Sequence, residues 1–154
     1  MKQRIHHFAR FAFAIVLGSC ILSHAAYAKD QTQALPRLQT VTLKIGDKLL
    51  ETEIANTPDQ RFMGLSFRKK LSENHAMLFV YSSEQKLVFT MRNTLLPLSI
   101  AFISKDFVIN EIHHMPVGPD QYFPAKKPAQ FALEVNQGWF ARNNVKVGAQ
   151  IKME

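Results

Sequence analysis

Three groups of side chains in this sequence have the types and spacing to do chemistry, and the first is the run Arg92, Asn93 and Thr94. Arg92 offers a planar cation, Asn93 both a donor and an acceptor, and Thr94 a hydroxyl. Together they would suit a sugar or a carboxylate. The alternative is that Asn93 bonds nearby backbone and sets a turn while Arg92 reaches solvent. Because the run stands between two apolar segments, it is the first candidate for a binding site.

The second group centres on Glu134, which lies in the alternating segment FALEV (residues 131–135). Within a strand, that alternation leaves a carboxylate either on the solvent face or paired with an arginine. The candidate partners are Arg61, Arg68 and Arg92. We expect a structural pair, and the other interpretation is that the pair orients a polar ligand.

The third group is the histidines. Adjacent residues of a strand point to opposite faces, so His113 and His114 cannot both bind one metal from a regular strand. One of them could join His75, Glu111 or Asp120, but the spacing does not require it, and the sequence predicts neither a metal nor a cofactor. Sequence motifs typical of nucleotide binding, serine hydrolases and zinc proteases are absent from the chain.

The N-terminus has the order of a secretory signal peptide. Basic residues come first, an apolar run follows, and Ala26 and Ala28 occupy the small-residue positions of a cleavage site. This order predicts a signal peptide over residues 1–28 and export to the periplasm or the medium. The alternative is a lipoprotein anchored at Cys20, because LGSC (residues 17–20) resembles a lipid-attachment box.

Cleavage after Ala28 would remove 28 of the 154 residues and leave 126, among them no cysteine. Three of the 19 basic residues and none of the 12 acidic ones would be lost, so the net charge would fall to +4. This modest and scattered charge argues against a nucleic-acid partner, and the apolar run is too short for a stable membrane span. Residues 29–38 predict a flexible linker before one domain over residues 39–154.

Local patterns predict two elements with particular clarity. Alternating apolar and polar residues over 40–54 predict a β-hairpin with a turn at Gly46. The segment from Thr57 to Gly64 predicts a short helix over Pro58–Met63, with Thr57 as N-cap, a capping box to Gln60 and Gly64 as C-terminal cap.

Further strands are predicted by short segments rich in aromatic and β-branched residues, at 76–81, 86–91, 98–104, 107–115, 130–135 and 145–153. Between them we expect a long proline-rich loop over 116–129 and a helical turn near 136–144 capped by Asn136. The predicted fold is mainly β (α+β), a small, largely antiparallel barrel-like or sandwich domain with one or two short helices. Tyr122, Phe123 and Trp139 would wall a pocket beside Arg92 or pack in the core.

Four blocks of the chain resemble the domain of unknown function 192 family: RFMGLSFRKKL, AMLFVY, FTMRNTLLPLSIAFI and ALEVNQGWFARNNVKVG, in that order. The resemblance runs from about Val41 to the C-terminus. It implies a compact, mainly β, barrel-like domain that is often exported, and it implies no reaction. The chain departs from the family pattern at Ala76, at Gly148-Ala149 and at Ser99, where the family usually carries an acid. If that acid were a general base, this chain should lack the activity.

The sequence therefore favours an exported binding or accessory domain for a polar envelope-derived ligand, namely a glycan, a sugar derivative or an organic anion. Its candidate site residues are Arg92, Asn93, Thr94, Arg61, Arg68 and Glu134. One alternative is an envelope hydrolase that uses Glu134 or His113/His114 as acid–base groups. Another is a protein–protein interaction module that uses the proline-rich loop.

Overall fold

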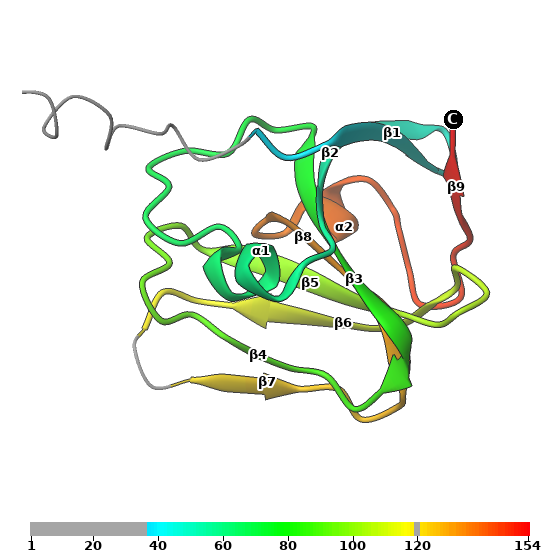
Figure 1. The fold of residues 1–154 in the computed structure, drawn as a ribbon. Helices are drawn as coiled ribbons and strands as arrows, with labels where there is room; N and C mark the ends of the chain where they lie inside the picture. The colour runs from blue at the N-terminus through cyan, green and yellow to red at the C-terminus, as the bar shows by residue number, and fades with distance from the viewer. Residues whose placement is uncertain (1–36, 119–120) are drawn as a thin grey trace, which may run out of the picture. The chain divides into compact units, whose positions relative to one another are not determined.

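The structure is a computed structural model that describes residues 37–118 and 121–154 (Figure 1). The predicted signal peptide, Cys20 and most of the predicted linker lie outside the described residues. Among the described residues, no helix combines the length and the apolar character needed to cross a membrane.

Seven strands form the main sheet, in the order β6-β5-β8-β3-β2-β1-β9. An isolated bridge between Val108 and Gln150 links the segments beside its two edge strands, and the sheet curls into a half-barrel (Figure 1). The mainly β prediction is therefore confirmed. The seven strands are β1 (Thr40–Ile45), β2 (Lys48–Ala55), β3 (His75–Gln85), β5 (Leu98–Ile103), β6 (Ile109–Met115), β8 (Ala129–Asn136) and β9 (Ile151–Met153).

The sheet is mixed, because β2 and β3 run parallel while the other described neighbours are antiparallel. The predicted hairpin is confirmed as β1–β2, with Gly46 at φ +62° in its turn. A parallel partner needs a crossover connection, and residues 56–74 supply it. Since that crossover contains α1, the helix sits where it can cover one face of the sheet.

Helix α1 (Pro58–Met63) begins and ends as its sequence predicts. The Thr57 hydroxyl accepts from the Gln60 N–H, the Gln60 side chain accepts from the Thr57 N–H, and Pro58 begins the helix. The N–H of Gly64 closes the last turn on the Gln60 carbonyl. The helix buries none of its own residues, so its position depends on the loop that follows it.

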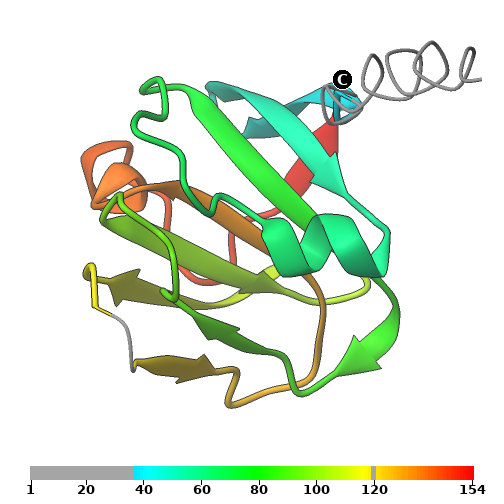
Figure 2. The same cartoon turned by 60° about the vertical axis from the view of Figure 1, so that its left-hand side comes forward.

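Each face of the main sheet carries its own apolar cluster. Leu78, Leu133 and Trp139 belong to the first cluster, on the face that α2 closes. Met77, Phe79 and other residues of the second cluster lie on the opposite face, and that face is covered by Leu65 from the loop after α1 and by a two-stranded ribbon (Figure 2). Because both faces are covered, strand β5, which lies between β6 and β8, is buried at all six residues.

The ribbon consists of β4 (Val88–Thr90) and β7 (Tyr122–Pro124), paired antiparallel. The prediction of an uninterrupted loop over 116–129 was wrong, since β7 forms inside it. The predicted strand over 86–91 is shorter and belongs to this ribbon instead of the main sheet. A three-residue strand with a proline at its end has little sequence signal, and its pairing depends on a partner more than 30 residues away.

Two predictions near the C-terminus were also wrong in detail. Helix α2 (Trp139–Arg142) has Gly138 as its N-cap and no side-chain cap. Asn136 instead ends β8 and donates to the carbonyls of Leu71 and Ser72. Of the predicted strand over 145–153, only β9 forms, because Gly148 at φ +90° turns the chain before it.

Candidate functional site

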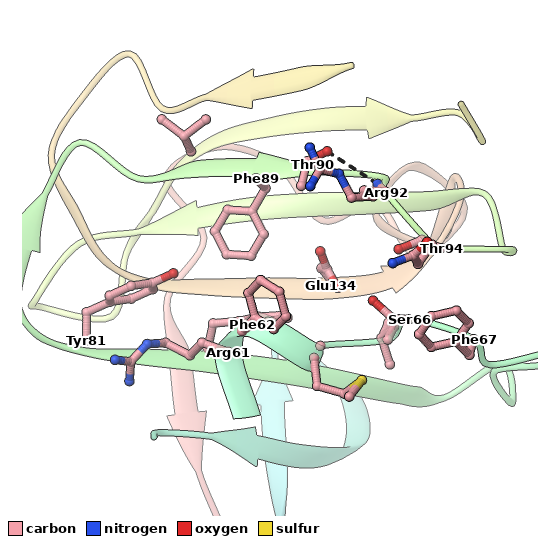
Figure 3. A pocket seen from close by; sticks show the side chains of 16 residues that line it. Arg61, Phe62, Ser66, Phe67, Tyr81, Phe89, Thr90, Arg92, Thr94 and Glu134 are labelled. Atoms are coloured by element: carbon pink, nitrogen blue, oxygen red, sulfur yellow. Dashed lines mark hydrogen bonds between the residues drawn. The ribbon is translucent and has the colours of Figure 1, made fainter. Parts of the chain in front are cut away.

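A cavity of about 350 Å³ lies between the second face of the main sheet, the loop after α1 and strand β4. Figure 3 shows Glu134 rising from β8 at its centre, with the α1 segment on one side and β4 with the following turn on the other. Its apolar lining is Phe62, Met63, Leu65, Phe67, Phe79, Val88 and Phe89. Its polar lining is Arg61, Ser66, Tyr81, Thr90, Arg92, Asn93, Thr94 and Glu134.

Glu134 forms the floor of this cavity and is only 5% exposed. Its strand neighbours in register are Met77 on β3 and Ile100 on β5, both fully buried. Burial between these apolar side chains raises the pKa of Glu134 to about 8, because a charged carboxylate is poorly solvated there. The side chain is therefore mostly protonated at neutral pH.

Among the described residues, no arginine forms an ion pair with Glu134, so the predicted pair was wrong. The predicted alternative was also wrong, because the Glu134 side chain does not lie on a solvent-exposed face. Arg68 instead makes a two-pronged ion pair with Glu53, with Nη–Oε distances of 2.5 and 2.6 Å. The Glu53 side chain is 27% exposed, so the ion pair is partly buried. That pairing takes Arg68 out of the cavity lining.

Arg61 is also occupied away from Glu134. Its Nη1 donates to the carbonyls of Asn56 at 2.6 Å and Val80 at 2.9 Å, and its guanidinium lies 4.7 Å from the centre of the Tyr81 ring. This stacking places a cation against one wall of the cavity. Burial raises the pKa of Tyr81 against the opposing effect of Arg61.

The run Arg92, Asn93 and Thr94 borders the cavity, as Figure 3 shows for Arg92 and Thr94. Arg92 is exposed, and its backbone N–H donates to the Thr90 hydroxyl. Asn93 has φ +60°, and its carbonyl accepts from the Phe67 N–H at 2.8 Å. Thr94 is 8% exposed and turns toward the cavity. The run thus sets a turn and lines a cavity at the same time.

The aromatic walls differ from those that the sequence suggested. Trp139 packs in the cluster on the opposite face, and neither Tyr122 nor Phe123 lines the cavity. The walls come instead from Phe62, Phe67, Phe79, Tyr81 and Phe89. Alternation in AMLFVY already indicated that Phe79 and Tyr81 share a face with Met77, although it did not say which face opens to a cavity.

The two adjacent histidines make separate contacts, as their strand positions require. His113 Nε2 lies 3.0 Å from Glu111, which also accepts from the Lys127 N–H at 2.8 Å. Burial raises the pKa of Glu111, but these bonds together outweigh it and hold that pKa below its usual value. No group of three His, Cys, Asp or Glu side chains is placed for a metal within the described parts of the chain.

His114 pairs with Ser99 across β5 and β6. The buried Ser99 hydroxyl accepts from the Gly138 N–H at 2.9 Å and lies within hydrogen-bond distance of His114 Nδ1, at 3.1 Å. A serine beside a histidine is one arrangement for a nucleophile. Ser99 is 0% exposed, however, which makes this pair a structural link between the sheet and α2.

Comparison with known proteins places the chain in a family. The sequence profile described as "DUF192: Uncharacterized ACR, COG1430" matches residues 41–153. The chain belongs to the DUF192 family. No curated protein matches this DUF192 chain at a significant level.

Two crystal structures resemble this DUF192 domain closely. A candidate transcription regulator from Sinorhizobium meliloti 1021 is 27% identical, with a TM-score of 0.73 over 76% of this chain and 95% of that one. A protein of unknown function from Novosphingobium aromaticivorans DSM 12444 is 30% identical, with a TM-score of 0.71 over 77% of this chain and 89% of that one. They support the half-barrel fold and leave the ligand open.

Proposed function

We propose that this DUF192 domain is an exported binding module whose cavity takes a small molecule with a polar group placed at Glu134. The observation that carries this proposal is a carboxyl that is 5% exposed, opens to a cavity of about 350 Å³ and has no ion-pair partner among the described residues. A carboxyl whose pKa is strongly raised and which lies in a cavity is a candidate for a functional site. The cavity volume also falls in the usual range of small-molecule sites.

Among the ligand classes that the sequence suggested, the lining favours a sugar derivative over an organic anion. An anion would face Glu134, while Arg61 and Arg68 already have protein partners. Arg92 also lines the cavity, but it is exposed at the rim and away from the floor. The aromatic walls and the hydroxyls of Ser66 and Thr94 instead suit a ligand with one apolar face and several polar groups.

An envelope hydrolase remains the second candidate, because a carboxyl with a raised pKa beside a cavity has the properties of a general acid. Glycoside hydrolysis generally needs a second carboxylate a few ångströms away. Glu134 is the one acidic residue among the 16 lining side chains, all of which belong to the described residues. His113 and His114 do not line this cavity either. We therefore favour binding over catalysis.

The test is a thermal-shift screen of the domain against amino sugars, neutral sugars, amines and small carboxylates. Phe62 is 89% exposed at the cavity mouth, so Phe62→Ala should leave the melting temperature unchanged but reduce any ligand-induced shift. Tyr122→Ala is the matched control, because Tyr122 is 64% exposed and does not line the cavity. Ligand shifts that are equal in both variants, or a screen without any shift, would contradict the proposal.

A further inference from the structure

We infer that the group recognised in this cavity is an organic ammonium, held between the Glu134 carboxylate and the aromatic side chains around it. This inference rests on the proposed function and names its ligand chemistry. It comes from three independent features of the site: an uncompensated buried carboxyl, aromatic walls and free hydroxyl acceptors.

The first feature is the charge balance at the cavity floor. Glu134 sits between Met77 and Ile100, and its oxygens reach neither an arginine nor a lysine among the described residues. A buried carboxylate is stable only when it is paired, and a ligand cation would supply the pair. A bound cation would shift Glu134 to its charged form, so ligand binding and proton release would be coupled.

The second feature is the set of aromatic rings. The rings of Phe79 and Phe89 meet edge to face with their centroids 4.9 Å apart, and both line the cavity together with Glu134. The exposed ring of Phe62 lies at the cavity mouth. Aromatic faces attract ammonium groups, and the attraction strengthens where water is excluded. The cavity already contains one such contact, since the Arg61 guanidinium lies over Tyr81. Arg61 and Arg92 also line the cavity, but Arg61 has protein partners and Arg92 is exposed at the rim. The aromatic rings and the single carboxyl at the floor therefore suit a cation.

The third feature is the set of acceptors that could take the N–H groups of a primary ammonium or the hydroxyl group of choline. The hydroxyls of Ser66 and Thr94 line the cavity on the same side as each other in Figure 3, and neither donates to a protein acceptor among the described residues. Thr90 is less suitable, because its hydroxyl already accepts from the Arg92 N–H. Glu134, Ser66 and Thr94 together offer acceptors from three separate segments.

The charged and titratable groups around Glu134 allow this assignment. Arg61 faces it from α1 but is held by two carbonyls and Tyr81, and Arg92 lies exposed at the rim after β4. Tyr81 faces it from β3, and its pKa is raised, so it remains neutral. On β5 the neighbour is Ile100, and beyond it His113 is engaged with Glu111.

The experiment measures binding of choline and of 3,3-dimethyl-1-butanol, which has the same shape without the charge, by isothermal titration calorimetry. Choline should bind more tightly than the alcohol. Its affinity should rise by roughly 25-fold between pH 6.5 and pH 8.5, because the ionised fraction of Glu134 rises over that range while choline keeps its charge. Glucosamine and an acetyl-Gly-Lys-Gly-amide peptide then distinguish a free amine from a protein lysine as the source of the ammonium.

Glu134→Gln should abolish the preference for choline and its pH dependence, whereas Glu51→Gln, which alters an exposed carboxylate outside the cavity, should change neither. Phe62→Leu is a second variant, and it should not affect folding because Phe62 is exposed. It should weaken choline binding more than alcohol binding. If the alcohol binds as tightly as choline, or if affinity falls as pH rises, Glu134 acts as a neutral donor and the ammonium assignment is wrong. In that case neutral ligands from the screen still support the binding function, whereas the absence of any ligand overturns both.

Discussion

The backbone N–H of Phe67 donates a 2.8 Å hydrogen bond to the carbonyl of Asn93, and both residues have positive φ, 62° and 60°. One belongs to the loop after α1 and the other to the turn after β4, so the bond joins two segments that line the cavity from different sides. We infer that this contact fixes the width of the cavity above Glu134. The same bond shows that the backbone of Asn93 has a structural role, because its carbonyl holds the loop after α1.

Substitutions at Asn93 should therefore act through backbone conformation. Asn93→Gly should stay within about 0.5 kcal/mol of the original stability, because glycine adopts positive φ freely. Asn93→Val should cost about 1–2 kcal/mol, because β-branched residues are strained there. Chemical denaturation measures both values. A glycine variant that is destabilised as much as the valine variant would show that the amide side chain matters more than the φ angle.

The stability of the domain should depend on pH through Glu134. Its folded pKa of about 8 lies above its unfolded value near 4.5, so the native state retains a proton that the unfolded state loses between these values. Stability should therefore be highest below pH 4.5 with respect to this group and fall as pH rises to 8. We expect a loss of about 2–3 kcal/mol between pH 5 and pH 7.

Glu134→Gln should remove this part of the pH dependence, because an amide does not titrate. Urea denaturation at pH 5, 6, 7 and 8 would compare the two proteins, with Glu51→Gln as the control for an exposed carboxylate. Parallel stability curves for the original domain and Glu134→Gln would mean that Glu134 is already ionised at pH 5.

Arg68 and Glu53 should show measurable coupling in a double-mutant cycle. Their two-pronged contact ties the loop after α1 to strand β2, with side chains 33% and 27% exposed. We expect a coupling energy of about 1 kcal/mol, since partial exposure weakens an ion pair. Arg68→Lys should recover less than half of it, because an ammonium cannot form both bonds. A coupling energy near zero in denaturation experiments would assign the pair no role in placing the loop.

Ser99 should contribute to stability through its two hydrogen bonds. Ser99→Ala leaves the N–H of the half-buried Gly138 without its acceptor and should cost about 1–3 kcal/mol. Ser82→Ala on the exposed end of β3 is the control and should cost little. An acid, which is usual at position 99 in the resembling family pattern, could accept from the same N–H. If Ser99→Ala were as stable as the original chain, another group would have to satisfy Gly138.

Local chemistry explains what the sequence determined by itself. The capping box of α1 involves residues three positions apart, and the β1–β2 hairpin needs only alternation and a turn that tolerates positive φ at Gly46. The run Arg92, Asn93 and Thr94 was identified for the same reason, because a polar interruption of apolar strands is visible without knowing the fold. These features depend on interactions within a few residues of the chain.

Tertiary structure alone decided the environment of Glu134. Alternation put Glu134 on the face opposite Leu133, but it could not show that this face is covered by the loop after α1 and by the β4–β7 ribbon. That cover depends on contacts distant in sequence, such as the pairing of Phe89 with Phe123 and the bond from Phe67 to Asn93. The sequence predicted that the Glu134 carboxylate would lie in an ion pair or in water. The tertiary cover of its face instead places it at the floor of a cavity.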